Sequence, residues 1–571
     1  MRSNPVSRLK LLFLERLRPG ELQRTLTAAA VIGCVGALAT IAFRESVFLL
    51  ETLLFGHADS LVKAAASLVW WRRMLYPAIG GACAGAVLQW AHRCLQAETG
   101  GDYMEAIALG NKRIGIRMSL LKAVSSALSV ASGSSIGREG SMVQLAALVG
   151  TLLGRLRNTP KPKLRLFVAC GAAAGIAAAY NAPIAGALFV AEIVLQSIAI
   201  ETLGPLLVAA VASNLTVHQF LGFGPVYHMP VFHLNLSVEA IAYALLGVVA
   251  GLLSPLFLHV LEFARRPFTV LPIPLWTKLA LGGFVVGGIS ILNPAVWGNG
   301  YSVVDSILQG GWAWDALLAI LLLKVLATAA TTGSGAVGGV FTPTLFVGAV
   351  IGCLFGEVIH QTWLGTSPLS AYTAVGMGAF LAATTHAPLM AIMMIFEMTE
   401  SYDLITPLML ACVLAYFVKR VLFDRSIYAR SLPAAKTDAF ALQTAADILR
   451  SGPPTVKVEQ SLADVEQAFL RSHWQHVYIT DHDGRFLGAV SLHDFGPYLR
   501  ASGNANAPLP SILLKTHYPR VSSDATLGSV LEAFSGHSGE RLPVLDEHEM
   551  LLGYVSKTDL MLVLRESVTA T

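Results

Sequence analysis

The chain has 571 residues, of which 54% are hydrophobic and 13% are charged, and its mean hydropathy is +0.61. Soluble domains carry about 25% charged residues, so this composition excludes a protein that lies wholly in water. The net charge of +4 is spread thinly and gives no reason to expect a nucleic-acid partner. The six cysteines lie in apolar stretches without CxxC spacing, so we expect neither a metal cluster nor a disulfide framework.

Residues 1–25 are predicted to form a cytoplasmic N-terminal segment. A basic run from Arg2 to Arg18 precedes the first apolar stretch, without the apolar core and small-residue cleavage site of a signal peptide. Positively charged flanks stay on the cytoplasmic side of a membrane. We therefore expect a multi-pass protein of the bacterial inner membrane with both termini in the cytoplasm. An amphipathic surface anchor is the alternative interpretation of the basic run.

Residues 26–430 are predicted to form an all-α membrane domain with interrupted helices. A full span needs about 20 apolar residues, yet many apolar runs here are shorter and end at glycine or proline. These short runs are Ser119 to Ala131, Met142 to Leu153, Leu166 to Tyr180 and Ile184 to Ile198. A broken helix leaves backbone groups unpaired, which a bilayer tolerates only where they line an enclosed cavity. The pattern therefore predicts a transport protein.

The membrane part contains an internal repeat. An Ala-Pro pair ending at Pro183 precedes an apolar run to Glu192, and a second pair ending at Pro388 precedes a run to Glu397. The two prolines and the two glutamates are separated by the same offset of 205 positions (388 − 183 and 397 − 192). Matching broken helices predict a repeat transporter whose site lies where the halves meet. The matched glutamates favour a shared structural role in pairing with helix ends.

Three stretches place glycines directly before an apolar helix: Gly100–Met104, Gly137–Ser141 and Gly338–Pro343. The first amides of a helix have no internal partner and carry a partial positive charge, so they attract an anion. Neutral donors suit rapid passage better than a full positive charge, which would hold the anion tightly. The alternative is ordinary helix capping between packed spans.

Glu139 is the strongest single candidate in these stretches. A charged side chain at the bilayer centre costs about 2.5 kcal/mol or more, so such a residue is a functional candidate by default. Its carboxylate could occupy the anion's place at a helix start and swing away on protonation. The alternative is a structural partner for Arg138. For Lys122 and Lys324 we expect snorkelling or pairing, and for His386 a hydrogen bond within a turn.

The sequences GREG at 137–140, GVFTP at 339–343 and YNAP at 180–183 resemble the signature stretches of ClC chloride channels and chloride/proton antiporters. This resemblance implies two inverted repeats, a homodimer with one pore in each subunit, and chloride as the transported ion, with no cofactor required. It also implies roles for the matching residues. The implied gating residues are Glu139 and Tyr428, and the implied anion-binding residues are Gly101, Gly137, Arg138, Gly140, Val340 and Phe341.

The chain departs from the family pattern at two places. Gly101 stands where the family usually has a serine whose hydroxyl contacts the anion, and Asp102 follows it. The capping-box-like spacing of Asp102 and Glu105 indicates that Asp102 caps its own helix, and a related DYM stretch is typical of a bacterial ClcB-like branch. Ile193 stands where proton-coupled members commonly have a second glutamate. This change predicts passive, channel-like conduction, and a proton-coupled antiporter remains the alternative.

The polar remainder is predicted to form a small α/β tandem. After a linker at 431–442, the residues 443–500 and 512–567 share short apolar strands and a Ser-x-x-Asp motif repeated at an offset of 65. The tandem resembles a pair of CBS domains. By that resemblance Ser491, Asp494, Ser556 and Asp559 are candidate ligands of an adenine nucleotide, and helix capping explains them equally well.

Two further classes are less consistent with the sequence. A CBS-containing divalent cation transporter needs several carboxylates together, and the membrane part offers isolated ones. An enzyme is not expected, because the sequence contains no H-E-x-x-H, G-x-S-x-G or CxxC motif. The expected partners are therefore chloride or similar anions, membrane lipid and a second copy of the chain.

Overall fold

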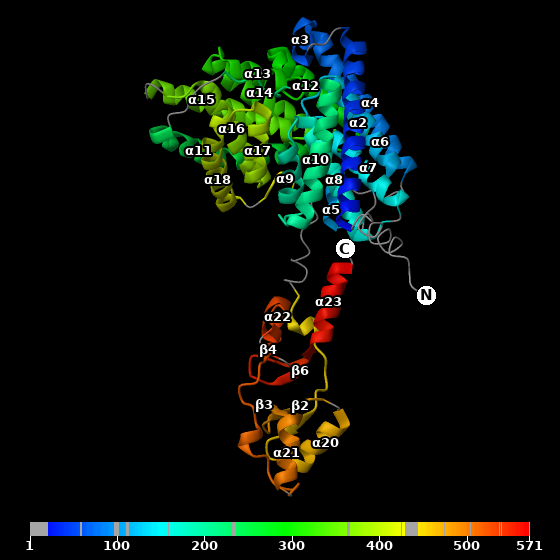
Figure 1. Cartoon of the computed structure of the whole chain (residues 1–571), viewed down its shortest axis with the longest axis vertical. Helices are drawn as coiled ribbons and strands as arrows, with labels where there is room; N and C mark the ends of the chain where they lie inside the picture. The colour runs from blue at the N-terminus through cyan, green and yellow to red at the C-terminus, as the bar shows by residue number, and fades with distance from the viewer. Residues whose placement is uncertain are drawn as a thin grey trace, which may run out of the picture. The chain divides into compact units, whose positions relative to one another are not determined.

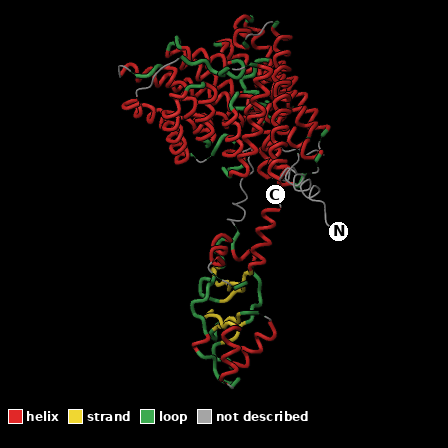
Figure 2. The backbone as a smooth tube through the Cα atoms, viewed as in Figure 1, coloured by secondary structure: helices red, strands yellow, loops and turns green. Residues whose placement is uncertain are grey.

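The computed structural model describes residues 21–56, 60–95, 102–109, 114–157, 159–222, 224–230, 236–362, 366–423, 425–428, 443–472, 474–502, 504–535, 537 and 539–569. The chain divides into two compact units, Met1–Pro433 and Ala434–Thr571. The first is almost entirely helical, and the second contains two small sheets (Figure 2). Gly101, most of the predicted N-terminal segment and the whole linker at 431–442 lie outside the described residues.

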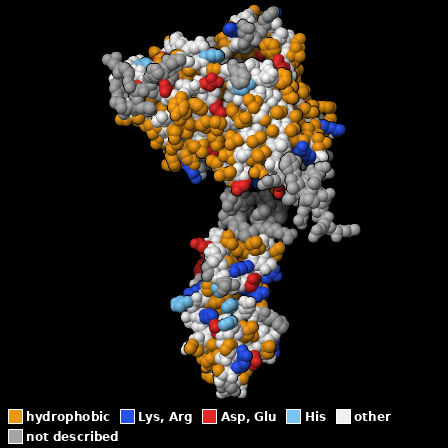
Figure 3. All heavy atoms as spheres, viewed as in Figure 1, with side chains coloured by type: hydrophobic (Ala, Val, Ile, Leu, Met, Phe, Trp, Pro, Cys, Tyr) orange, Lys and Arg blue, Asp and Glu red, His pale blue; other side chains and the backbone are white. Residues whose placement is uncertain are grey.

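The first unit is built from α-helices of very different lengths (Figure 1). The helices are α2 (Glu21–Phe55), α3 (Leu61–Ser67), α4 (Trp70–Cys94), α5 (Tyr103–Leu109), α6 (Ile116–Ala131), α7 (Glu139–Leu156), α8 (Lys161–Tyr180), α9 (Pro183–Leu188), α10 (Ile200–Leu221), α11 (Leu236–Val270), α12 (Leu275–Leu292), α13 (Tyr301–Gln309), α14 (Trp314–Gly333), α15 (Phe341–Thr362), α16 (Leu369–Thr385), α17 (Pro388–Thr399) and α18 (Ile405–Leu422). Among the described residues, eight helices are long and apolar enough to cross a membrane. Hydrophobic side chains cover much of the visible surface of this unit, as expected for contact with lipid (Figure 3).

The interrupted helices lie where the sequence predicts them, with one difference. The run expected to reach Ile198 instead ends at Val194, and its last six residues form a π-helix, Phe189–Val194, that continues α9. Gln196 has a positive φ of 52°, which turns the backbone out of the helix. An apolar run alone does not reveal such a turn, and single π turns inside helices are frequent at functional sites.

The two halves of this unit meet at pairs of equivalent residues. Helices α4 and α12 pack against each other. A Cβ at Gly81 would lie 2.4 Å from the carbonyl oxygen of Leu279, and one at Gly283 would lie 2.0 Å from that of Pro77. Both glycines are therefore required for the backbones to approach this closely. The two glycines are 202 positions apart (283 − 81), close to the offset of 205 between the matched prolines and glutamates, so the contact joins corresponding parts of the repeats.

The glutamates at equivalent repeat positions cap each other's helices, as predicted. Helices α9 and α17 lie side by side (Figure 1). Glu397 in α17 accepts hydrogen bonds from the first free amides of α9, those of Ile184 at 2.9 Å and Ala185 at 2.8 Å. Glu192 accepts the corresponding bonds from the start of α17, at 3.3 and 2.9 Å. Each carboxylate thus satisfies amides that a helix start leaves unpaired.

The buried lysine of α14 is paired rather than snorkelling. Lys324 is fully buried, and its Nζ donates to the carbonyl oxygens of Val296 at 2.8 Å and Gly298 at 2.7 Å. His386 ends α16 in the left-handed conformation with φ 62°, and its backbone amide donates to the carbonyl oxygen of Ala382. The hydrogen bond within the turn is thus made by the backbone, and the His386 side chain instead lies with Nε2 3.1 Å from Lys419 Nζ of α18.

The second unit consists of two similar α/β repeats. The first contains β1 (Thr455–Lys457), α20 (Leu462–Ser472), β2 (His476–Thr480), β3 (Phe486–Ser491) and α21 (Leu492–Ser502); the second contains β4 (Val521–Ser522), α22 (Leu527–Ser535), β5 (Arg541–Leu545), β6 (Leu551–Ser556) and α23 (Lys557–Thr569). In each sheet the first strand pairs parallel and the last antiparallel to the middle strand. Each repeat has its own hydrophobic cluster, and Ala445, which precedes the first repeat, packs into the cluster of the second.

Candidate functional site

A cavity of about 300 Å³ lies inside the membrane unit. It collects segments that are far apart in the sequence: the starts of α5, α7 and α15, parts of α6 and α8, and the stretch after α18. Among the sequence-predicted residues, those that line it are Glu139, Gly140, Val340, Phe341 and Tyr428. All three glycine-rich stretches lead to this one cavity, although Gly101 itself lies outside the described residues.

A reciprocal pair of backbone hydrogen bonds fixes one wall of the cavity. The amide of Gly137 donates to the carbonyl oxygen of Gly339, and the amide of Gly339 donates to that of Gly137, both at 2.8 Å. Each of these residues lies two positions before the first residue of its helix, Glu139 of α7 or Phe341 of α15, so equivalent positions of the two repeats pair with each other. These two hydrogen bonds hold the starts of α7 and α15 together. The Gly137 amide, which was predicted to bind an anion, is therefore already bonded to a carbonyl oxygen.

The Glu139 side chain lies over this pair of glycines. A Cβ at Gly137 would lie 1.9 Å from Glu139 Oε2, so only glycine leaves room for the carboxylate in this position. Thr342 Oγ1 donates to Glu139 Oε1 at 2.5 Å, and the Tyr180 hydroxyl lies 3.3 Å from Thr342 Oγ1. Glu139 is only 3% exposed. The buried carboxylate therefore lies at a junction of two helix starts, where the helix dipoles favour negative charge.

The start of each of these helices offers neutral donors to the cavity. Helices α7 and α15 begin at Glu139 and Phe341, and the first amides of a helix have no partner within it. Both helix dipoles direct their positive ends to this point. The adjoining Gly140 and Val340 also line the cavity. The resulting environment attracts an anion without a full positive charge from the helix starts themselves.

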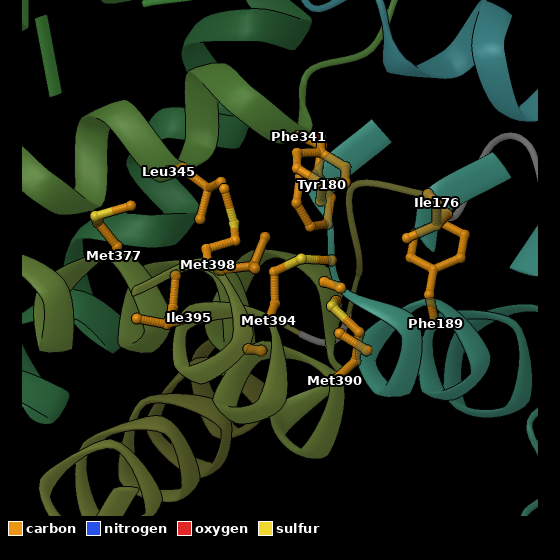
Figure 4. Packing of buried hydrophobic residues seen from close by; sticks show 14 of the residues in the cluster. Ile176, Tyr180, Phe189, Phe341, Leu345, Met377, Met390, Met394, Ile395 and Met398 are labelled. Carbon is orange, nitrogen blue, oxygen red and sulfur yellow. The ribbon is translucent and has the colours of Figure 1, made fainter. Parts of the chain in front are cut away.

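Aromatic side chains connect Glu139 with Tyr428. Ring centroids are separated by 4.9 Å between Tyr180 and Phe341, 6.3 Å between Phe341 and Phe189, and 5.7 Å between Phe189 and Tyr428. Tyr180 and Phe341 lie beside each other, and Phe189 lies near Ile176 (Figure 4). The backbone amide of Ile427 donates to the carbonyl oxygen of Thr384 at 2.9 Å, which positions the Tyr428 segment.

Further polar groups line the cavity, and of these Asp102 and Lys122 were singled out from the sequence, whereas Ser119 and Gln144 were not. Tyr103 N donates both to Asp102 Oδ1 at 2.8 Å and to Gln144 Oε1 at 2.9 Å. Gln144 Nε2 donates in turn to Ser119 Oγ at 2.9 Å. Gln144 lies one and a half turns into α7, and only the fold brings it to α5. Asp102, Ser119 and Gln144 line the cavity together with Lys122.

Three predicted residues lie outside the cavity lining, namely Gly137, Arg138 and Ile193. Arg138 precedes α7 as its N-cap and is half-buried, and its charge acts on Glu51 and Arg44 of α2. Ile193 lies in the π-helix, is 4% exposed and packs in the main hydrophobic cluster. The Ile193 side chain therefore makes apolar packing contacts only. Within the described ranges, no group of three histidine, cysteine or acidic side chains could hold a metal ion.

In the second unit, the Ser-x-x-Asp motif of the second CBS-like repeat is fully engaged. Asp559 forms a fork with Arg450 through bonds of 3.0, 3.0 and 2.6 Å, and it accepts from Ser556 Oγ at 2.6 Å. Ser556 Oγ accepts from Asp559 N at 3.0 Å. Burial opposes ionisation of Asp559, but the bonds from Arg450 and Ser556 outweigh it and lower the pKa.

The motif of the first repeat is more open. Asp494 Oδ2 lies 2.7 Å from Lys515 Nζ, and this bond lowers the pKa of Asp494. Ser491 Oγ accepts from His493 N at 3.3 Å. In both repeats these residues stabilise the start of the following helix, as helix capping predicts.

The first unit combines long apolar helices with interrupted helices in two equivalent halves, and helix starts surround its cavity. These features together define an integral membrane transport protein. The family described as "Voltage gated chloride channel" matches residues 80–420, and the CBS domain family matches residues 445–495 and 512–566. The chain therefore belongs to the ClC family and carries a CBS domain pair.

Known relatives and structures agree with this assignment. A relative from Ralstonia nicotianae, described as ClcB-like, is 51% identical over 425 residues, which cover 74% of this chain and 99% of the relative. The structure of a slow cyanobacterial Cl⁻/H⁺ antiporter is 25% identical, with a TM-score of 0.64, and the match covers 72% of this chain and 97% of that one. The structure of a eukaryotic CLC transporter has the same fold, with a TM-score of 0.62 at 19% identity, over 94% of this chain and 98% of that one. The predicted fold class, two inverted repeats of the ClC type followed by a CBS tandem, is confirmed.

Proposed function

We propose that this chain conducts chloride across a membrane and that the Glu139 carboxylate gates the passage. The observation that carries the proposal is the position of Glu139 over the Gly137–Gly339 pair, inside a cavity that Tyr428 also lines. In this position the carboxylate occupies the place where two helix starts attract negative charge. A permeating anion takes that place when Glu139 leaves it.

The proposed passage uses neutral donors at each step. The amides of Val340 and Phe341 and the hydroxyl of Tyr428 bind the anion, while Gly140 lets the backbone approach closely. Protonation of Glu139 removes the charge that competes with the anion and favours rotation of the side chain away from the helix starts. Thr342 stabilises the closed position through its hydrogen bond to Oε1.

Ile193 supports passive conduction over proton exchange. Proton transfer along the pathway needs a titratable group, and the side chain of Ile193 is apolar and buried. We therefore propose channel-like conduction. A chloride/proton antiporter is the second candidate. The similarity to the cyanobacterial antiporter favours it, and the cavity also contains a second carboxylate, that of Asp102.

Purified full-length protein in liposomes distinguishes these functions. Under a chloride gradient, we expect chloride efflux from the native protein without stoichiometric proton uptake. Glu139→Ala and Glu139→Gln should raise efflux and remove its dependence on pH, whereas Glu201→Gln, an exposed change in α10, should leave it unchanged. Proton uptake driven by chloride would favour the antiporter, and efflux no faster than from empty liposomes in all variants would exclude anion transport.

We propose that the protein acts as a homodimer with one pathway in each subunit, in the bacterial inner membrane, with both termini in the cytoplasm. Exposed apolar side chains on several long helices support contact with lipid or with a second copy. Native mass spectrometry from lipid nanodiscs should give twice the mass of one chain. Cysteine-labelling reagents confined to one side of the membrane would test the position of the termini.

An adenine nucleotide is the proposed ligand class for the CBS pair. Arg450, Asp447 and Asp559 line a pocket of about 390 Å³ in the second unit, which offers both charge and space. Because Asp559 is bound to Arg450, a ribose must displace that arginine or bind at the more open Asp494. Calorimetric titration with ATP, ADP and AMP tests the proposal, and the absence of binding heat in all three would exclude it.

A further inference from the structure

The Asp102 carboxylate is a charged group in the cavity that the proposed gate does not use. It lines the same cavity as Glu139 and Tyr428, and its Oδ1 accepts a hydrogen bond from the Tyr103 amide at 2.8 Å. We propose that Asp102 is a second tethered anion, which competes with the permeating anion for the cavity end formed by Tyr103 and Lys122. This inference rests on the proposed function and adds a specificity-determining residue to it.

The geometry of Asp102 differs from that of an ordinary helix cap. The backbone carbonyl of Asp102 accepts from Ala106 N at 2.9 Å, which makes Asp102 the N-cap of α5. An N-cap side chain normally bonds the amide of the second or third helical residue. Here it bonds the first one, Tyr103, which already has an acceptor in Gln144 Oε1 at 2.9 Å. The carboxylate is therefore not required to satisfy this amide.

The polar surroundings suit an anion better than a neutral side chain. Lys122, from α6, lines the cavity next to these groups, and its charge acts on Asp102. Of the cavity-lining residues that the structure describes, Lys122 is the one cation. Gln144 is 6% exposed and is held by Ser119, so its position is fixed. A mobile halide and the Asp102 carboxylate would compete for the same amide and the same ammonium group.

The competition has a direct physical consequence. An ionised carboxylate inside an enclosed cavity repels a halide, and the low dielectric of the surroundings strengthens the repulsion. It also neutralises the attraction of Lys122. Removing the charge of Asp102 should therefore raise the affinity for chloride by about tenfold, equal to about 1.4 kcal/mol. Asp102 would thus act on the permeating anion as Glu139 does, from a different segment of the cavity lining.

The test is chloride binding and chloride efflux with full-length protein carrying Asp102→Asn or Asp102→Ser. Asparagine keeps the acceptor oxygen for Tyr103 N and removes the charge, so folding should be retained, as checked by size-exclusion chromatography. Calorimetry should show about tenfold tighter chloride binding, and efflux should change accordingly. Lys122→Met in the Asp102→Asn background should reverse the gain. The matched control is Glu105→Gln, which removes a carboxylate from the same helix outside the cavity lining.

The outcomes separate this inference from the proposed gate. Chloride affinity within twofold of the native protein, or weaker, in both Asp102 variants would overturn it, as would an equal gain in Glu105→Gln. If these results appear while Glu139→Ala still raises efflux, the proposed function stands without the second tethered anion. If chloride efflux through both Glu139→Ala and Asp102→Asn is no faster than efflux from empty liposomes, the proposed function itself fails.

Discussion

Thr342 donates a hydrogen bond from its hydroxyl to Oε1 of Glu139 at 2.5 Å, across 203 positions of the sequence. The two residues belong to the starts of α15 and α7, one from each half of the membrane unit. A hydrogen bond to a charged group contributes about 1.5 to 3 kcal/mol. In the proposed gate, the second half of the molecule therefore stabilises the observed position of the Glu139 carboxylate, which the first half carries.

Thr342→Val should weaken the closed position of the gate. Valine has nearly the same shape and lacks the hydroxyl, so Glu139 loses one donor while the packing is retained. A loss of about 1.4 kcal/mol corresponds to a tenfold shift toward the open position. We expect chloride efflux at neutral pH to rise by up to about tenfold, measured in liposomes.

Thr344→Val is the matched control for this prediction. Thr344 lies in the same helix, and its hydroxyl donates to the carbonyl oxygen of Val340 at 2.7 Å, so it does not contact Glu139. Its substitution should leave the efflux rate within about twofold. Equal effects of both valine variants would contradict a specific role for Thr342.

Gly137→Ala should displace the Glu139 carboxylate. The new Cβ would lie 1.9 Å from Glu139 Oε2 and 2.9 Å from the carbonyl oxygen of Gly339, and both contacts are too short to persist. Overpacking of this kind costs about 1 to 3 kcal/mol. We expect a lower thermal unfolding midpoint together with faster chloride efflux. Gly288→Ala in α12, where nothing lies within 4 Å of the new Cβ, should change neither measurement.

Glu397→Gln should destabilise the junction of α9 and α17. The carboxylate accepts two amide hydrogen bonds, at 2.9 and 2.8 Å, and glutamine can replace one of them. We expect the free energy of unfolding to fall by about 1 to 3 kcal/mol, measured by thermal unfolding in detergent. Glu192→Gln should have a smaller effect, because one of its bonds is longer, at 3.3 Å. A change in efflux without a change in stability would contradict the structural role.

Asp559→Asn should destabilise the CBS pair in a pH-dependent way. Burial raises the pKa of Asp559, but the bonds from Arg450 and Ser556 lower the pKa by more than burial raises it. The pKa of Asp559 is therefore below its usual range. The stabilisation is therefore present above the unfolded pKa of about 3.9 and is lost as the pH falls through the lower folded value. We expect a loss of about 1 to 2 kcal/mol at pH 7 in urea unfolding of residues 434–571.

The variant and the native domain pair should become more similar as the pH falls below the unfolded pKa of about 3.9, because acid removes the same ion pair from the native protein. Asp494→Asn is the control, since this aspartate occupies the equivalent position of the first repeat and its partner Lys515 is about half exposed. Screening by solvent should limit its effect to less than about 1 kcal/mol. An equal loss in both variants at pH 7 would contradict the special role of the Arg450–Asp559 pair.

The sequence predicted the parts of the site that belong to local motifs. Glycines before apolar runs indicated the stretches that contain Glu139, Val340 and Phe341, the resemblance to the ClC family implied the roles of Val340 and Phe341, and all three residues line one cavity. The equal offset of Glu192 and Glu397 indicated a shared role, and their capping bonds confirm it. Repetition in the sequence carried this information, because equivalent residues meet across the two halves.

The contacts that depend on distant packing could not be predicted in this way. Thr342 lies within a recognised stretch, but its bond to Glu139 requires the two helix starts to be placed side by side. Gln144 is a polar residue in an apolar helix and belongs to no motif, and only the fold brings it to Tyr103. The π-helix around Ile193 has no sequence signal, because its residues are as apolar as those of an ordinary helix.

The two hydrogen bonds between Gly137 and Gly339 limit how the gate can move. Since these bonds join the two backbones, neither helix start can shift relative to the other without breaking a pair of backbone hydrogen bonds. If Glu139 gates the passage as proposed, we expect opening to be a change of side-chain torsion at Glu139 over a stationary pair of helix starts. Such rotamer changes take nanoseconds when unhindered, so the frequency of opening should follow the arrival of protons and anions rather than a slow rearrangement of helices.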